Sequence, residues 1–140
     1  MTVPASSGPD RTLHVVAAVV VRDDGRFLLV RKRGTTAFMQ VGGKIEPDEE
    51  PVAALARECA EEIGLDVDVA TVRPVGRFTA VAANEPGHTI DAHVFEVDLP
   101  TGFEPQALAE IDELVWIDPA DPGTRREIAP LSLDLLALAR

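Results

Sequence analysis

The sequence has few of the residues on which several classes of protein depend. It contains one cysteine, Cys59, so no disulfide can form within the chain and nothing points to an oxidising compartment. Lysine and arginine number 13 against 24 aspartates and glutamates, which gives a formal net charge of −11. A general grip on DNA or RNA is therefore not expected, because such binding uses basic side chains to neutralise backbone phosphates.

Long hydrophobic runs are also missing. The longest apolar stretch, Leu13 to Val21, is far too short to span a bilayer, and the N-terminal residues lack the order of a secretory signal. With 140 residues, 46% of them hydrophobic and 26% charged, the chain has the composition of one globular domain. We predict a cytoplasmic protein without membrane contact, in which a flexible N-terminal tail at 1–10 precedes a single domain at 11–140.

Apolar patterning and turn signals predict a mixture of strands and helices. The valine-rich first stretch is typical of a strand covered on both faces. Strands are expected over 13–21, 27–30, 67–83, 88–99 and 113–117, and helices over 51–63 and 131–140. One helix in the middle of the sequence and another at the end favour a fold of the α+β class, an α/β/α sandwich with a mixed β-sheet between helices.

The central helix is predicted to have an inner and an outer side. Pro51 suits a first helical position, and Gly64 is typical of a helix end. Apolar residues recur at intervals of four, three and four, a stripe that packs inward: Val52, Ala56, Cys59 and Ile63. A different face carries three acids: Glu58, Glu61 and Glu62. Cys59 lies on the inward stripe and the sequence indicates no histidine partner for it, so we expect a core thiol rather than a nucleophile.

Two physical penalties fall on this acidic face. Carboxylates three or four residues apart on a helix repel one another by roughly 0.2–0.5 kcal/mol per pair. They also lie near the helix C-terminus, where the macrodipole favours bases. A hard divalent cation with oxygen ligands would remove both penalties, so we predict a metal site, and phosphate chemistry as its use.

The spacing of these residues resembles the Nudix box, G-x5-E-x7-R-E-U-x-E-E-x-G-U, where U is a bulky apolar residue. Every fixed position is met, by Gly43, Glu49, Arg57, Glu58, Glu61, Glu62 and Gly64, with Cys59 and Leu65 in the apolar positions. The chain departs from the commonest form at Val41, Asp48 and Glu50, where proline, glycine and a serine or threonine cap are usual. None of these three is a ligand position.

The resemblance implies a hydrolase that cleaves a nucleoside diphosphate linked to another group, with Mg²⁺ or Mn²⁺ bound at the box. The metal would be held by Glu58, Glu61, Glu62 and Gly43. Catalytic roles fall to Glu61, Glu62 and Arg57, with one of the glutamates or a nearby carboxylate taking the proton from the attacking water. Structural roles within the motif fall to Gly42, Glu49 and Gly64, and Arg57 is mainly an organiser that pairs with Glu49.

Relatives often supply another glutamate from beyond the box. Glu113 is placed like that residue and joins the catalytic candidates, although Glu96 and Glu110 compete with it. Glu46, just after Gly43, is an auxiliary ligand candidate.

Substrate contacts are harder to assign from sequence. The basic run at 31–33 is better explained as the solvated end of a strand than as a phosphate contact, and the same holds for Lys44. Arg31 and Lys44 are therefore only candidates for contact with the substrate. Phe38, in the loop before the box, has the best aromatic claim on a base. His14, His88 and His93 lack metal-ligand spacing, and no zinc site is expected.

A nucleoside triphosphate or modified nucleotide, cleaved at a pyrophosphate bond, is the first expectation for the substrate. A proline of ADP-ribose-cleaving relatives is missing near Ala80 and Val81, and tyrosine, used by the dinucleoside-polyphosphate branch, is absent. These features disfavour ADP-ribose and dinucleoside polyphosphates as substrates but do not exclude them. A nucleotide-sensing module without turnover is the rival from another class, which the intact glutamate set disfavours. The oligomeric state stays open, a homodimer included.

Overall fold

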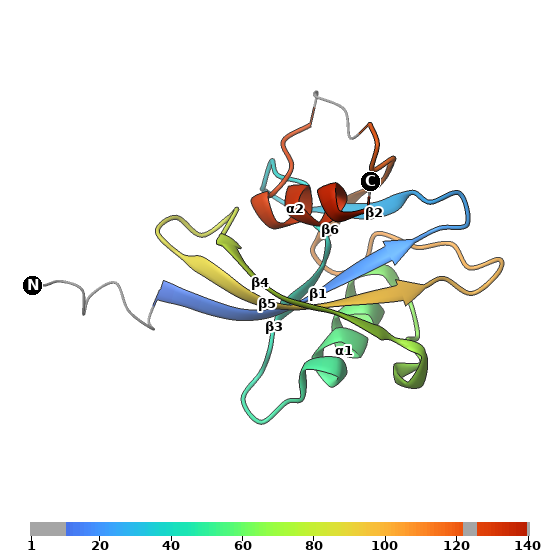
Figure 1. Ribbon diagram of the computed structural model, residues 1–140, viewed down its shortest axis with the longest axis horizontal. Helices are drawn as coiled ribbons and strands as arrows, with labels where there is room; N and C mark the ends of the chain where they lie inside the picture. The colour runs from blue at the N-terminus through green and yellow to red at the C-terminus, as the bar shows by residue number, and fades with distance from the viewer. Residues whose placement is uncertain (1–10, 122–125, 140) are drawn as a thin grey trace, which may run out of the picture.

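The computed structural model describes residues 11–121 and 126–139 (Figure 1). Six strands and two α-helices follow in the order β1 (Thr12–Val21), β2 (Phe27–Lys32), β3 (Val41–Lys44), α1 (Pro51–Ile63), β4 (Arg73–Val81), β5 (Thr89–Asp98), β6 (Ile111–Ile117) and α2 (Pro130–Leu138). A short 3₁₀ turn, η3 (Val69–Thr71), precedes β4. The expected tail at 1–10 lies outside the described residues and stays a prediction.

The strands form one mixed sheet with β1 at its centre. The order is β4-β5-β1-β2-β6, and β3 also pairs with β1. β1 and β5 run parallel over ten aligned residue pairs, whereas the remaining pairings are antiparallel. The predicted mixed sheet is therefore confirmed, with a parallel pair joining segments far apart in the sequence.

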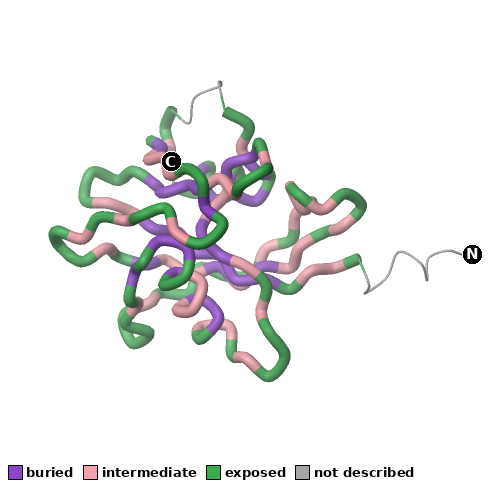
Figure 2. Tube along the Cα trace, turned by 180° about the vertical axis from the view of Figure 1, so that it is seen from behind, coloured by how far each residue is buried: buried purple, intermediate pink, exposed green. Residues whose placement is uncertain are grey.

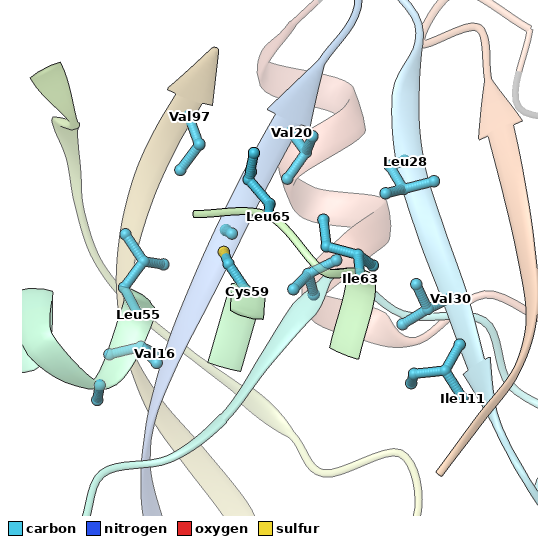
Figure 3. Packing of buried hydrophobic residues seen from close by; sticks show 13 residues of the cluster. Val16, Val20, Leu28, Val30, Leu55, Cys59, Ile63, Leu65, Val97 and Ile111 are labelled. Carbon is cyan, nitrogen blue, oxygen red and sulfur yellow. The ribbon is translucent and has the colours of Figure 1, made fainter. Parts of the chain in front are cut away.

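The two helices cover opposite faces of this sheet, as Figure 1 shows with α1 below and α2 above. Alternation along β1 serves both faces. Val16 and Val20 pack in the cluster on the α1 side with Leu55, Cys59 and Ile63 (Figure 3). Residues of opposite parity in β1 join a second cluster with Leu131 and Leu135 of α2. The α/β/α sandwich is confirmed, and the buried trace runs through its centre (Figure 2).

Local differences from the sequence prediction have identifiable causes. The β-rich stretch at 67–83 begins instead with η3, because the Asp68 side chain accepts a hydrogen bond from the Ala70 N–H and caps a tight turn. The Val41–Lys44 segment, which is not among the expected strands, forms β3 by pairing with β1. In the described part of the chain, no helix has the length and apolarity needed to cross a membrane.

Candidate active site

The predicted acidic helix is present, and its end places the glutamates. α1 stops at Gly64, whose left-handed backbone has a φ of 74° and whose N–H donates to the Ala60 carbonyl. The next N–H, of Leu65, donates to the Cys59 carbonyl, which completes a C-terminal cap that favours glycine. The last turn carries no basic residue. The acids therefore lie at the negative pole of the helix, as the sequence indicated.

Arg57 ties α1 to the loop that precedes it. Its guanidinium donates two hydrogen bonds, each 2.9 Å long, to the two oxygens of Glu49. It also donates to Glu58 Oε2 at 2.8 Å and to the Lys44 carbonyl at 3.0 Å. The pairing with Arg57, together with the N–H of Glu46, lowers the pKa of Glu49 to about 2, and the two carboxylates raise the pKa of Arg57. This fork holds the β3 end, the loop and the helix in one arrangement.

The two glycines at β3 let the sheet approach α1 closely. A β-carbon on Gly42 would lie 2.1 Å from the Val16 carbonyl oxygen, and φ at Gly42 is +155°. A β-carbon on Gly43 would lie 2.5 Å from Glu58 Oε2. Both positions therefore require glycine. A side chain at position 42 would clash with the backbone, whereas one at position 43 would clash with a carboxylate.

Glu62 is a buried acid. Its side chain is 3% exposed, and Oε1 accepts a hydrogen bond from the Gly42 N–H at 3.2 Å. Burial raises the pKa of Glu62 to about 8, because the hydrogen bond from the Gly42 N–H and the positive charge of Lys32 only partly offset the loss of water. Burial also raises the pKa of Glu58. The negative charge at this end of α1 is therefore incompletely compensated by the protein.

A cavity of about 780 Å³ lies beside these residues. Glu58, Glu61 and Lys44 line it, whereas Glu62 lies behind Gly42. Of the three acids Glu61 is the most exposed, with 54% of its side chain accessible. In residues 11–121 and 126–139 the acids are not gathered into a ready-made three-ligand cluster. Their donor chemistry, carboxylate oxygens beside the β3 backbone, nevertheless fits a hard divalent cation.

Several predicted substrate residues lie elsewhere. Arg31 and Glu113 face each other across β2 and β6, with Arg31 Nε donating to Glu113 Oε1 at 2.9 Å. Neither lines the cavity. Phe38 is 6% exposed and packs in the cluster on the α2 side, so a stacking role for Phe38 is at odds with its place in the core. Lys44 does line the cavity and lies 3.5 Å from Glu85.

The cavity includes charged residues that sequence reasoning undervalued. Lys32 and Glu110 both line it, with Nζ and Oε2 4.0 Å apart. Strand parity was the available signal, because Lys32 shares a face of β2 with Leu28 and Val30, which pack on the α1 side. Arg31 points to the other face.

The comparisons with known proteins show the family of the chain. The family model of the NUDIX domain matches residues 12–138. The chain belongs to the Nudix hydrolase family. Among curated relatives, a MutT-like protein of Streptomyces ambofaciens is 34% identical over 86% of this chain and 73% of its own length. The CTP pyrophosphohydrolase of Escherichia coli K12 is 31% identical over 90% of each chain.

Solved structures share the architecture. The solution structure of the Escherichia coli ORF135 protein is 32% identical to this chain, with a TM-score of 0.68 over 91% of this chain and 87% of its own. A MutT NUDIX hydrolase from Burkholderia pseudomallei is 22% identical, with a TM-score of 0.74 over 90% and 96% of the two chains. The second likeness concerns the fold alone.

Proposed function

We propose that this Nudix hydrolase uses Mg²⁺ or Mn²⁺ to hydrolyse a nucleoside triphosphate or modified nucleotide at a pyrophosphate bond. One observation carries the proposal. Among the described residues, one hydrogen-bond donor, the Gly42 N–H, reaches the buried Glu62 carboxylate. Glu62 lies in the same helix as Glu58 and Glu61, which line a cavity of nucleotide size. An arrangement that is costly without a cation is well explained by binding one.

Glu58, Glu61 and Glu62 would hold the metal. When bound, such an ion supplies charge neutralisation at phosphate oxygens and a lowered pKa for a bound water. Because Gly43 has no side chain, the β3 backbone comes close to Glu58, and the Arg57 fork keeps Glu58 oriented. The contribution of the protein is therefore to hold the three acids close together and in fixed orientations.

Other cavity residues suit the remaining tasks. Lys32 and Lys44 supply positive charge toward a polyphosphate. We assign to Glu61 the task of taking a proton from the attacking water, because it is the most exposed of the three acids. Glu110 lines the cavity and replaces Glu113 as our candidate for the carboxylate from beyond the box.

Cytidine triphosphate is the first substrate to test, because a relative of similar length is named a CTP pyrophosphohydrolase. The test incubates the protein and Mg²⁺ with CTP, UTP, GTP, ATP, ADP-ribose and a dinucleoside polyphosphate, and follows products by chromatography. We expect metal-dependent release of a nucleoside monophosphate and pyrophosphate from a triphosphate. Glu62→Gln should abolish it, whereas Glu104→Gln, a change at an exposed site outside the cavity, should not.

The rival is a nucleotide sensor of the same fold. Binding of a nucleotide with no product from any member of the panel would favour the sensor and overturn the hydrolase. A cytoplasmic location and a homodimer stay predictions, testable by fractionation and light scattering.

A further inference from the structure

Ser132 is a buried polar residue that the metal site does not explain. Among the residues that the structure describes, Glu62 and Ser132 are the polar or charged side chains that are fully buried, and Ser132 is 1% exposed. It lies in the first turns of α2, on the opposite face of the sheet from α1. A buried hydroxyl requires hydrogen-bond partners, and both partners of Ser132 belong to one residue, Gln40.

These two bonds determine how the Gln40 amide is turned. The Gln40 backbone N–H donates to Ser132 Oγ at 2.9 Å, and the Ser132 hydroxyl donates to Gln40 Oε1. A hydroxyl has one proton, and Oε1 is its acceptor here, so the carbonyl end of the amide faces Ser132. The reversed amide would leave the buried hydroxyl proton without an acceptor, at a cost of about 1–3 kcal/mol. Gln40 Nε2 therefore points away from Ser132.

The backbone around Gln40 is held on both sides. Met39 exchanges two backbone hydrogen bonds with Val30, at 2.7 and 2.8 Å. Phe38 accepts from the Ala129 N–H and donates to the Glu127 carbonyl, each at 2.8 Å. The segment between β2 and β3 is thereby fastened to both β2 and the chain entering α2, beside which it runs in Figure 1. Gln40 is presented from a rigid position.

Gln40 lines the same cavity as the acidic helix. The cavity wall around Gln40 is largely apolar and includes Met39, Ala129 and Leu131. Helix α1 contributes Glu58 and Glu61 to the same cavity. No hydrogen-bond acceptor for Gln40 Nε2 is found within 11–121 and 126–139. The cavity therefore joins an acidic end suited to a metal polyphosphate with a part that is apolar apart from one oriented donor.

We infer that Gln40 is a specificity-determining residue that donates a hydrogen bond from Nε2 to a carbonyl oxygen of the substrate's nucleobase, with Ser132 as its positioning residue. The inference rests on the proposed function for the place of the phosphates. Because Oε1 is engaged by Ser132, Gln40 acts as a donor only. Cytosine offers this donor a carbonyl oxygen, O2, whereas adenine has no carbonyl and accepts only at ring nitrogens, so Gln40 favours cytosine over adenine.

The test compares CTP with ATP in three proteins. Gln40→Met keeps the length but removes the amide. Gln40→Glu keeps an acceptor for Ser132 and exchanges the Nε2 donor for an acceptor. The ratio of kcat/KM for CTP to that for ATP should fall about 3–10-fold in Gln40→Met, the effect of one neutral hydrogen bond. In Gln40→Glu it should fall further, because a carboxylate oxygen repels the carbonyl oxygen to which the amide donates. Ser132→Ala should also lower the ratio, since the amide is free to turn.

A readout that needs no turnover separates this inference from the proposed hydrolysis. Calorimetric titration of each protein with CMP and AMP, in the presence of Mg²⁺, should show the same changes in the ratio of dissociation constants. If the wild type hydrolyses no nucleotide but its preference for CMP falls in both Gln40 variants, the hydrolase proposal fails and this inference stands. A wild type without the preference, or an unchanged ratio in folded Gln40→Glu, overturns the inference whether or not CTP is cleaved.

Discussion

Gly43 lies so close to Glu58 that a β-carbon on the glycine would be 2.5 Å from the carboxylate oxygen Oε2. The first residue of the box is thus a glycine because the Glu58 side chain of α1 occupies the space that a β-carbon would need. The neighbouring Gly42 has a different role, because its absent β-carbon would meet the Val16 carbonyl oxygen, which belongs to the central strand and cannot move aside. One glycine serves the site and the other serves the sheet.

Gly43→Ala should separate activity from folding. The new methyl group displaces the flexible end of Glu58 and leaves the backbone in place, so the melting temperature should change by no more than about 3 °C. Displacement of one ligand should weaken Mg²⁺ binding by about 10–100-fold. Calorimetric titration with Mg²⁺ and thermal unfolding of the metal-free protein measure the two effects. Strong destabilisation with normal metal affinity would contradict the assignment.

Gly42→Ala is the matched comparison for that experiment. Its methyl group clashes with backbone at a φ that L-residues rarely adopt, so we expect a loss of at least about 2 kcal/mol in the free energy of unfolding. Urea denaturation measures it.

Arg57→Lys should impair the site while keeping the charge. Lysine cannot make the two parallel bonds to Glu49 together with the bond to Glu58, so Glu58 loses its orientation. We expect kcat/KM to fall about 10–100-fold, the usual effect of removing a group that orients a metal ligand. A variant such as Arg26→Lys, on the β1–β2 turn, is the control, and equal losses in the two variants would argue against the fork.

The buried Glu62 predicts how metal-free stability depends on pH. Its pKa is raised to about 8, so the folded state binds a proton that the unfolded state releases above the ordinary carboxyl pKa. Its contribution is most favourable below the unfolded pKa and is lost as pH rises through the folded pKa. Between pH 5 and 8, wild type should therefore lose about 1–3 kcal/mol relative to Glu62→Gln in chelator-treated samples.

Saturating Mg²⁺ should reverse this trend. The ion competes with the proton for the carboxylate, so the stabilisation it provides grows as pH rises. Urea titrations of wild type and Glu62→Gln at several pH values, with and without Mg²⁺, measure both slopes. Parallel pH profiles for the two proteins without metal would show that Glu62 does not titrate in this range.

The carboxylate from beyond the box can be identified by a pair of isosteric changes. Glu110→Gln alters a residue that lines the cavity, and we expect kcat to fall by at least about 10-fold if it assists proton transfer. Glu113→Gln alters a residue paired with Arg31 outside the cavity, and we expect kcat to change by less than about 2-fold. Steady-state kinetics on the preferred substrate decide between them, and the opposite result would restore Glu113.

Sequence reasoning succeeded where the pattern was local. The acidic face of α1 and its end at Gly64 follow from helical periodicity and cap residues. The pairing of Arg57 with Glu49 was expected from the resemblance to the Nudix box, and the structure contains it. The inward place of Cys59 followed from the same periodicity, and burial raises the pKa of its thiol to about 12.

It failed where partners are distant in the chain. Arg31 meets Glu113 because of the β2–β6 register, which includes an irregularity between Arg31 and Lys32 that no composition rule indicates. Phe38 is buried because its segment pairs with the chain entering α2. Gln40 and Ser132 are 92 positions apart, so their contact exists only once the sheet has formed.

The parallel pairing of β1 with β5 has a consequence for synthesis. β1 leaves the ribosome first but gains its ten-residue neighbour only when residues 89–98 have been made. Until then the valine-rich segment has an open edge toward β5, although β2, β3 and α1 can already assemble on it. During that interval the nascent chain exposes an unpaired, aggregation-prone strand edge. Slow translation of the segment after the box would lengthen the time in which this edge can self-associate or bind chaperones.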